Sequence, residues 1–158
     1  METSAGRDVL HRARRHTVAD CRHAGLRARV RRRFSHAFEP PAPVVPVRLG
    51  APGGHESAAL DGKIDTGADL CGIPERLVIE LDLPPIRNVR AVGFAGSARD
   101  VVVYRVDVEI DGLVFPRVEA LAVDRTYALL GRNLLRVLVV RLDGPREWLD
   151  LRRPRIKT

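Results

Sequence analysis

The segment Gly62-Lys63-Ile64-Asp65-Thr66-Gly67-Ala68-Asp69 carries most of the information about the fold. Asp65 follows an apolar strand end on a tight turn, so its carboxylate can face a cleft. Thr66 can brace the turn through its hydroxyl, and Gly67 permits close backbone approach because it has no Cβ. The motif occurs once in the chain. A pair of carboxylates that share one proton therefore needs a second copy of the chain, related by two-fold symmetry.

Short apolar strands separated by turn residues dominate the rest of the sequence. Pro46 marks an edge strand, because proline cannot donate to a ladder, and Asp111-Gly112 is typical of a type I′ hairpin turn. A helix beginning at Pro74 is predicted over 74–81. Strands are predicted over 44–49, 57–64, 101–110, 113–115, 118–123, 137–142 and 147–151. This pattern indicates a mostly β fold, a small closed β-barrel or sandwich with one or two short helices.

The positive charge is concentrated in the first quarter of the 158-residue chain. Residues 1–43 hold ten Arg and four acidic residues, which gives +6 of the total charge of +7. This segment ends in the proline-rich linker 39–43, and its scattered apolar residues bury too little surface to offset the entropy of ordering. We therefore expect an Arg-rich, flexible or loosely helical extension over 1–43, one domain over 44–152 and a basic tail over 153–158.

The role of the extension stays open among three interpretations. It is a solvated segment, a nucleic-acid arm whose Arg side chains neutralise phosphates, or an Arg-rich targeting peptide interrupted by Asp8 and Asp20. Few aromatic residues accompany the Arg, so nucleic acid is expected as a partner only through this tail. No secretory signal or membrane-spanning apolar run is visible, which predicts a cytoplasmic protein without membrane contact.

Metal and disulfide chemistry have little support in the sequence. The two cysteines, Cys21 and Cys71, are too few for a disulfide framework or a zinc set, and four of the five His lie in the extension. We expect no metal and no cofactor. Cys71 is interpreted as a small buried apolar residue and not as a reactive thiol.

Two further segments sharpen the interpretation of the Asp65 turn. A Gly-containing hairpin occupies 92–97, and Leu129-Leu130-Gly131-Arg132-Asn133-Leu134-Leu135 leads into a short helix. In this order and spacing, the three segments resemble the retropepsin-like aspartic peptidases over nearly all of 44–152. The resemblance implies the β-barrel of that family. It also implies site residues: Asp65 as the catalytic residue, Thr66, Gly67 and Ala68 as loop and substrate support, Asp69 and Arg132 as a positioning pair, and Gly93, Phe94, Ala95 and Gly96 in a flap.

The resemblance further implies an activity and an assembly. Two Asp65 carboxylates, one from each subunit of a homodimer, would activate a water that hydrolyses a peptide bond in a polypeptide substrate. Thr66 would hydrogen-bond across the two-fold axis, and the carbonyl oxygen of Gly67 would accept from the substrate backbone. The alternative is a catalytically silent module that keeps the fold for dimerisation or peptide binding.

Lys63 and the chain ends depart from the family pattern. Lys63 stands where relatives place an apolar residue that lines a substrate pocket, so it either favours acidic side chains or packs its stem and keeps its ammonium in water. The terminal strands that pair in retroviral dimers are flanked here by charged tails. Trp148 and Leu151 are candidate anchors of the interface, because large apolar groups dominate such contacts.

Overall fold

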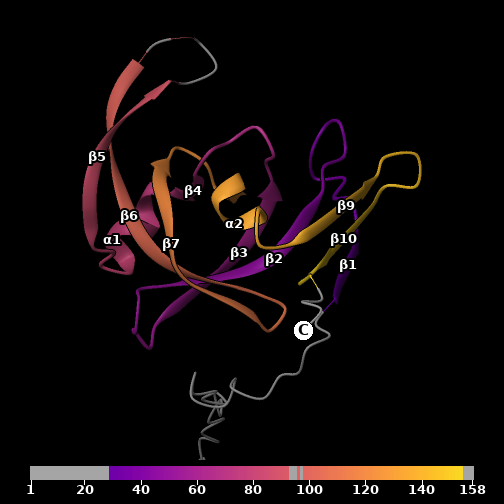
Figure 1. Ribbon diagram of the computed structural model, residues 1–158, viewed down its shortest axis with the longest axis horizontal. Coiled ribbons are helices and arrows are strands. Elements are labelled where there is room, and N and C mark those ends of the chain that lie inside the picture. The colour runs from indigo at the N-terminus through magenta and orange to yellow at the C-terminus, as the bar shows by residue number, and fades with distance from the viewer. Residues whose placement is uncertain (1–28, 93–95, 97, 155–158) are drawn as a thin grey trace, which may run out of the picture.

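The computed structural model describes residues 29–92, 96 and 98–154. In this part the chain forms ten strands and two short helices (Figure 1). The strands are β1 (Arg29–Arg33), β2 (Val44–Gly50), β3 (Ser57–Ile64), β4 (Cys71–Pro74), β5 (Pro85–Val92), β6 (Ala98–Ile110), β7 (Leu113–Val123), β8 (Ala128–Leu130), β9 (Val139–Asp143) and β10 (Trp148–Arg152). The helices are α1 (Glu75–Glu80) and α2 (Arg132–Leu135). No helix in the described part is long and apolar enough to cross a membrane.

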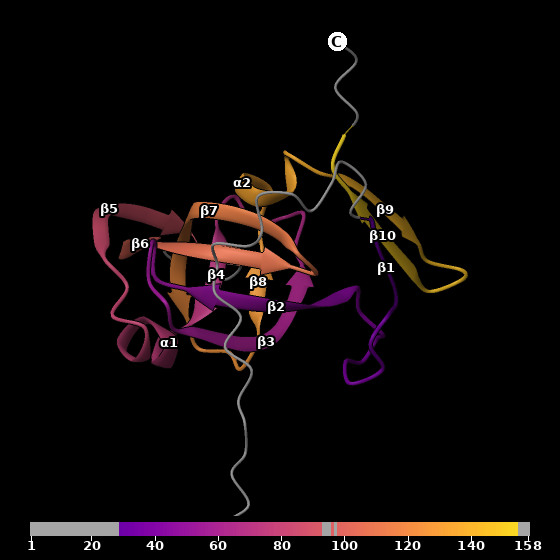
Figure 2. The same ribbon diagram turned by 90° about the horizontal axis from the view of Figure 1, so that it is seen from below.

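Six of the strands close into a barrel (Figure 2). Their order is β2-β3-β8-β4-β7-β6, and the ring closes where residues 48–50 of β2 pair with residues 107–109 of β6. Most neighbours run antiparallel, whereas β3 with β8 and β4 with β7 run parallel. The closed β-barrel with two short helices that the sequence predicts is therefore confirmed.

The strand period of two separates the barrel interior from its surface. In β2, Val45, Val47 and Leu49 are at most 2% exposed, whereas Pro46 and Arg48 between them face solvent. Pro46 pairs with β3 on one side only, whereas residues 48–50 of the same strand pair with both β3 and β6. β2 is thus an edge strand at Pro46, as predicted, and becomes an interior strand of the barrel from Arg48 onward.

The turn between β6 and β7 has the predicted type, but β7 is longer than predicted. Asp111 and Gly112 have φ of 49° and 81°, as a type I′ turn requires. The two strands expected over 113–115 and 118–123 form the single strand β7. The pairing of β6 with β7 continues past Pro116 because its register shifts between Val106 and Val108. Opposite this shift, Arg117 has a φ of 54°.

β5 and β6 form a long hairpin that reaches beyond the barrel (Figure 1). Their pairing extends as far as Val92 and Ala98. The predicted flap residues Gly93, Phe94 and Ala95 lie outside the described residues, and Gly96 is described with a φ of 75°. A hairpin is therefore present where the flap is predicted, and the role of its tip stays a prediction.

A second sheet, with the strand order β1-β10-β9, lies beside the barrel (Figure 2). Here the structure differs from the sequence prediction, which placed residues 1–43 in a flexible or loosely helical extension. β1 pairs with β10 over its whole length, and Val30 is 2% exposed opposite Leu151. A single buried apolar side chain, Val30, is enough to order β1, because β10 supplies both the hydrogen-bonding partner and the apolar face. The ends of the domain stay predictions.

The two residues expected to anchor an interface are engaged within their own chain. Leu151 is 0% exposed, so the prediction that it anchors a contact with a second chain is wrong. Trp148 is half-buried, and the guanidinium carbons of Arg31 and Arg33 each lie 4.5 Å from its ring centroid. The two arginines thus contact the Trp148 ring through cation–π interactions within the same chain.

Candidate active site

Asp65 continues the parallel ladder between β3 and β8. Lys63 and Ile64 pair with Leu129 and Leu130, and the Asp65 N–H donates to the carbonyl oxygen of Leu130 over 3.1 Å. This ladder carries Asp65 to the edge of the barrel, where β3 ends. The backbone of Asp65 is therefore fixed by the second motif, which lies far away in the sequence.

The Asp65 side chain is oriented by its own turn. The N–H groups of Gly67 and Ala68 donate to Asp65 Oδ1 over 3.1 and 3.2 Å. Among the described residues no hydrogen bond to Oδ2 is present. One carboxylate oxygen is thus held by backbone donors, whereas the other accepts no hydrogen bond from the described residues.

The start of α2 clamps the loop that follows Asp65. The N–H of Arg132 donates to the carbonyl oxygen of Ala68 over 2.8 Å, and the N–H of Asn133 donates to that of Asp69 over 3.1 Å. A Cβ on Gly131 would lie 2.4 Å from the carbonyl oxygen of Leu70, so only glycine lets the two segments approach this closely. The sequence predicted that both motifs matter, and the structure brings them into contact.

Asp69 and Arg132 form the ion pair that the sequence predicted. Both side chains are open to solvent in the single chain, with 80% and 61% of their surface exposed. Exposed ion pairs contribute little to the stability of an isolated chain. The structure thus brings the two side chains together across the loop and α2, and their role in positioning the loop stays a prediction.

Cys71, which is buried, and Asn133, which is half-buried, form a hydrogen-bonded brace beneath the loop that the sequence analysis missed. The Gly131 N–H donates to Cys71 Sγ over 3.3 Å, the thiol donates to Asn133 Oδ1 over 3.3 Å, and Asn133 Nδ2 donates to the carbonyl oxygen of Glu119 over 2.7 Å. Burial raises the pKa of Cys71 to about 11, so the thiol stays neutral and unreactive. The sequence offered one sign of this brace, namely a polar Asn133 next to Leu134 and Leu135 at the start of a short helix.

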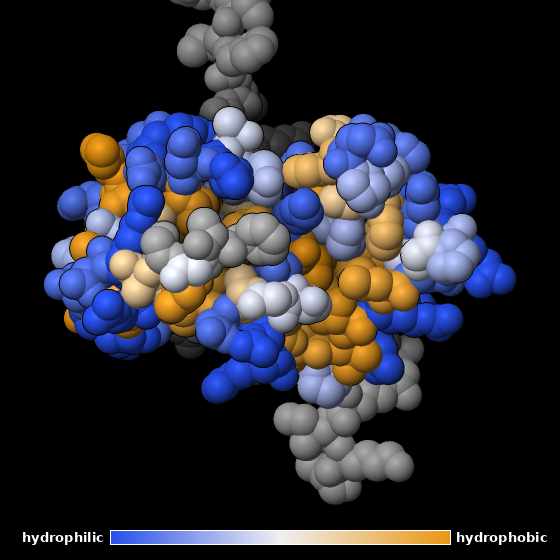
Figure 3. Space-filling model, turned by 90° about the horizontal axis from the view of Figure 1, so that it is seen from above, coloured by the Kyte–Doolittle hydropathy of each residue, from blue (hydrophilic) through white to orange (hydrophobic). Residues whose placement is uncertain are grey.

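The loop itself faces outward on the side of the molecule seen in Figure 3. Asp65 is half-buried, whereas Thr66, Gly67 and Asp69 are exposed. The Asp65 carboxylate is thus supported by backbone donors and partly open to solvent, and the chain carries this motif once. Among the described residues no three His, Cys, Asp or Glu side chains are placed to hold a metal ion.

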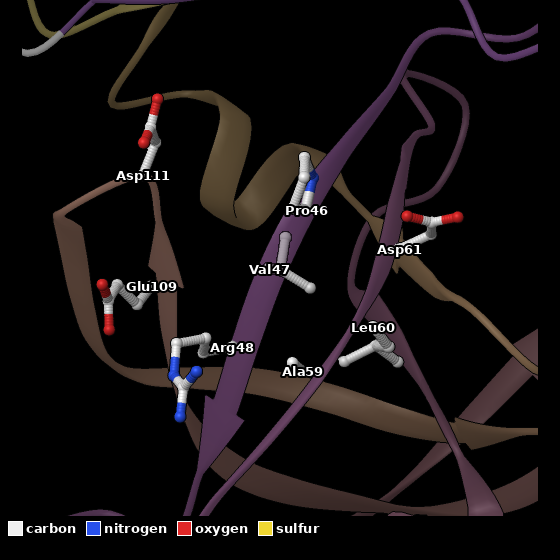
Figure 4. A pocket seen from close by; sticks show the side chains of 8 residues that line it. All are labelled: Pro46, Val47, Arg48, Ala59, Leu60, Asp61, Glu109 and Asp111. Atoms are coloured by element: carbon white, nitrogen blue, oxygen red, sulfur yellow. The ribbon is translucent and has the colours of Figure 1, made fainter. Parts of the chain in front are cut away.

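A hollow of about 630 Å³ lies elsewhere, at the seam of the barrel (Figure 4). Its lining residues come from β2, β3, the end of β6 and the turn after β6. It is lined by Pro46, Val47, Arg48, Ala59, Leu60, Asp61, Glu109 and Asp111. None of the motif residues lines it, so the hollow is not the candidate active site.

The sequence and the fold of this chain are similar to those of known proteins. Residues 45–134, more than half of the chain, match the family model described as aspartyl protease. A retropepsin-like aspartic protease from Rickettsia conorii has 15% sequence identity and a TM-score of 0.55, with 79% of this chain and 90% of that chain covered. The inhibitor-bound EIAV protease has 21% identity and a TM-score of 0.44, with 60% and 86% covered. No curated protein matches the sequence closely.

Proposed function

Because the chain belongs to the aspartyl protease family and has a retropepsin-like fold, we propose that it is an aspartic endopeptidase that acts as a homodimer. The observation that carries the proposal is Asp65, held by the N–H groups of Gly67 and Ala68 on an outward-facing loop clamped by α2. Each subunit supplies one Asp65, and the two carboxylates meet at the two-fold axis.

Two carboxylates in contact cannot both ionise cheaply, so the pair holds one proton between them. The charged Asp65 takes a proton from a water as the water oxygen attacks the peptide carbonyl carbon, and the protonated Asp65 donates to the carbonyl oxygen. As the resulting gem-diol collapses, the C–N bond breaks, the Asp65 that took the water proton gives it to the leaving nitrogen, and the other Asp65 takes a proton from a gem-diol hydroxyl. No covalent intermediate with the enzyme forms.

The neighbours of Asp65 position it for this reaction. The N–H groups that hold Oδ1 leave Oδ2 to face the water and the second carboxylate. Thr66 is exposed and is proposed to hydrogen-bond the partner's loop, while the carbonyl of Gly67 accepts from the substrate backbone. The ion pair of Asp69 and Arg132 positions the loop, and the partner subunit covers it in the dimer.

The edge of β9 is the surface proposed to meet the second copy. β9 pairs with β10 on one side, and its other side has no strand partner among the described residues. Val139 and Leu142 on this strand and Val137 just before it are 36%, 45% and 46% exposed. Apolar surface gathers on this face of the molecule (Figure 3). An open apolar edge strand invites pairing with another chain.

Cleavage of a diverse peptide pool by the full chain tests the function. Wild type and Asp65→Asn are compared between about pH 3.5 and 7.5, a range that covers the titration of carboxylate pairs, and the mass of each protein is measured in solution. We expect cleavage by wild type, none by Asp65→Asn, and a dimer in both. A stable wild-type dimer that cleaves nothing would instead indicate a silent binding module.

A matched pair of surface variants tests the dimer interface. Leu142→Arg places a charge on the β9 edge, whereas Ile79→Arg places one on α1, where Ile79 is 83% exposed. Burying an unpaired charge is costly, so Leu142→Arg is expected to be monomeric and inactive, and Ile79→Arg to remain dimeric and active. A dimeric, active Leu142→Arg would contradict the proposed interface.

A further inference from the structure

Lys63 lies two residues before Asp65 and on the same side of β3. Ile64 between them is 6% exposed and Gly62 is buried, so these two face the barrel interior. Alternation along a strand then turns Lys63 and Asp65 to the outer side, with their Cα atoms about 6.6 Å apart. The four-carbon stem of lysine lets its ammonium reach a ligand bound at Asp65.

One aromatic ring lies against the ammonium, and a second ring packs on the first. Lys63 Nζ lies 4.9 Å from the ring centroid of Phe38, and Phe38 meets the ring of Tyr127 edge-on, with centroids 5.0 Å apart and an interplanar angle of 82°. Tyr127 directly precedes β8, whose Leu129 pairs with Lys63. Segments far apart in the sequence thus meet in one half-exposed cluster around Lys63, which itself lies two residues before Asp65.

The ammonium has no carboxylate partner among the described residues. Asp61, which lies on the same side of β3, forms no ion pair with Lys63, and neither does Glu39, next to Phe38; both are exposed. The contact with Phe38 holds the ammonium in place but does not neutralise its charge. Half-buried aromatic neighbours lower the local dielectric, so an incoming carboxylate is attracted more strongly here than at an open surface.

Resting on the proposed function, we propose that Lys63, Phe38 and Tyr127 form a side-chain subsite that selects Asp or Glu within two residues of the scissile bond. An acidic substrate side chain at this place is otherwise repelled by the charge on the Asp65 pair. Lys63 cancels that repulsion and adds an ion pair, while the rings contact the methylene groups of the substrate. Two-fold symmetry places one such subsite on each side of the bond.

The experiment compares peptides that differ at one position next to the cleaved bond, which carries Glu, Gln, Leu or Lys. The enzymes are full-length wild type, Lys63→Met, which keeps the stem, and Lys63→Glu, which reverses the charge. Arg48→Met removes a charge from the outer face of β2 far from Asp65 and serves as the matched control. The ratio of kcat/KM for the Glu and Gln peptides reports the charge preference alone.

We expect wild type to cleave the Glu peptide about tenfold better than the Gln peptide, because an ion pair worth about 1.4 kcal/mol corresponds to a factor of ten. Lys63→Met brings the ratio to about one, Lys63→Glu favours the Lys peptide, and Arg48→Met behaves as wild type. Cleavage with the same Glu to Gln ratio in all four proteins overturns the subsite and leaves the proposed function standing.

Binding to an inactive protein separates the subsite from the reaction. Fluorescence anisotropy measures the affinity of Glu and Gln peptides for Asp65→Asn, with and without Lys63→Met. Tighter binding of the Glu peptide that depends on Lys63 supports the subsite even where no peptide is cleaved. Equal binding of the two peptides overturns it, whatever the outcome for cleavage.

Discussion

Gly131 is the position where one added carbon should disturb the candidate site most. Its φ of −82° suits any residue, so Gly131→Ala introduces no backbone strain of its own. The new Cβ would lie 2.4 Å from the Leu70 carbonyl oxygen and 2.9 Å from the Cys71 nitrogen, whereas ordinary contact begins at 3.4 Å. The shortfall of 1.0 Å (3.4 minus 2.4) involves backbone atoms, so the loop after Asp65 has to move.

The expected costs follow from this displacement. Overpacking of a tight site typically costs about 1–3 kcal/mol of the free energy of unfolding. Movement of a catalytic group by about 1 Å can lower activity about 100-fold. We therefore expect Gly131→Ala to unfold at lower denaturant concentration and to lose about 100-fold in kcat/KM, with the loss in activity exceeding the fraction of protein that is unfolded.

Gly144→Ala is the matched control. Gly144 lies in the turn between β9 and β10, and a Cβ there would meet nothing within 4 Å. This variant should stay within about 0.5 kcal/mol of wild type and retain full activity. Denaturant unfolding followed by Trp148 fluorescence, together with peptide cleavage, measures both quantities. If Gly131→Ala matched Gly144→Ala in both assays, the proposed clamp between α2 and the Asp65 loop would be refuted.

Three more variants or conditions probe the parts around the loop. Asn133→Ala removes the hydrogen bond to Glu119 and leaves the Cys71 thiol without its acceptor, so the free energy of unfolding should fall by about 1–3 kcal/mol in urea titration. Arg132→Met should change that free energy by less than about 1 kcal/mol, because the pair with Asp69 is exposed, yet lower peptide cleavage at least about tenfold. Cys71 should resist iodoacetamide in the native protein and react in urea, since burial raises its pKa from 9.0 to about 11. The unfolded thiol ionises first, so the free energy of unfolding should fall as the pH rises from 9.0 to about 11, by roughly 1.4 kcal/mol per pH unit.

The parts of the fold that the sequence predicted well are those with local signals. β3 begins and ends where predicted, because alternation and the turn at Asp65 mark it, and Asp111-Gly112 adopts the expected turn because both residues tolerate positive φ. The Asp69 and Arg132 pair was predicted through the family resemblance, and the structure brings the two side chains together.

The parts that were missed depend on contacts between distant segments. β1 holds one buried apolar residue, Val30, and forms only because β10 offers it hydrogen bonds and an apolar face. The brace between Cys71 and Asn133 joins residues on different elements, so the sequence marks Asn133 as a polar residue beside two leucines but does not identify Cys71 as its partner. The role of Lys63 also depends on a distant segment. The sequence left two interpretations open, and the contact with Phe38 is the observation from which we propose that Lys63 selects acidic side chains.

Subunit mixing tests the shared Asp65 site most directly. Wild-type chain is mixed with increasing amounts of Asp65→Asn, subunits are allowed to exchange, and peptide cleavage is measured per wild-type chain. If each site needs Asp65 from both subunits, activity per wild-type chain falls to about half at equal amounts and to about one tenth at a ninefold excess of the variant. Activity per wild-type chain that stays constant while mixed dimers form would contradict the account, because each chain would then carry a complete site.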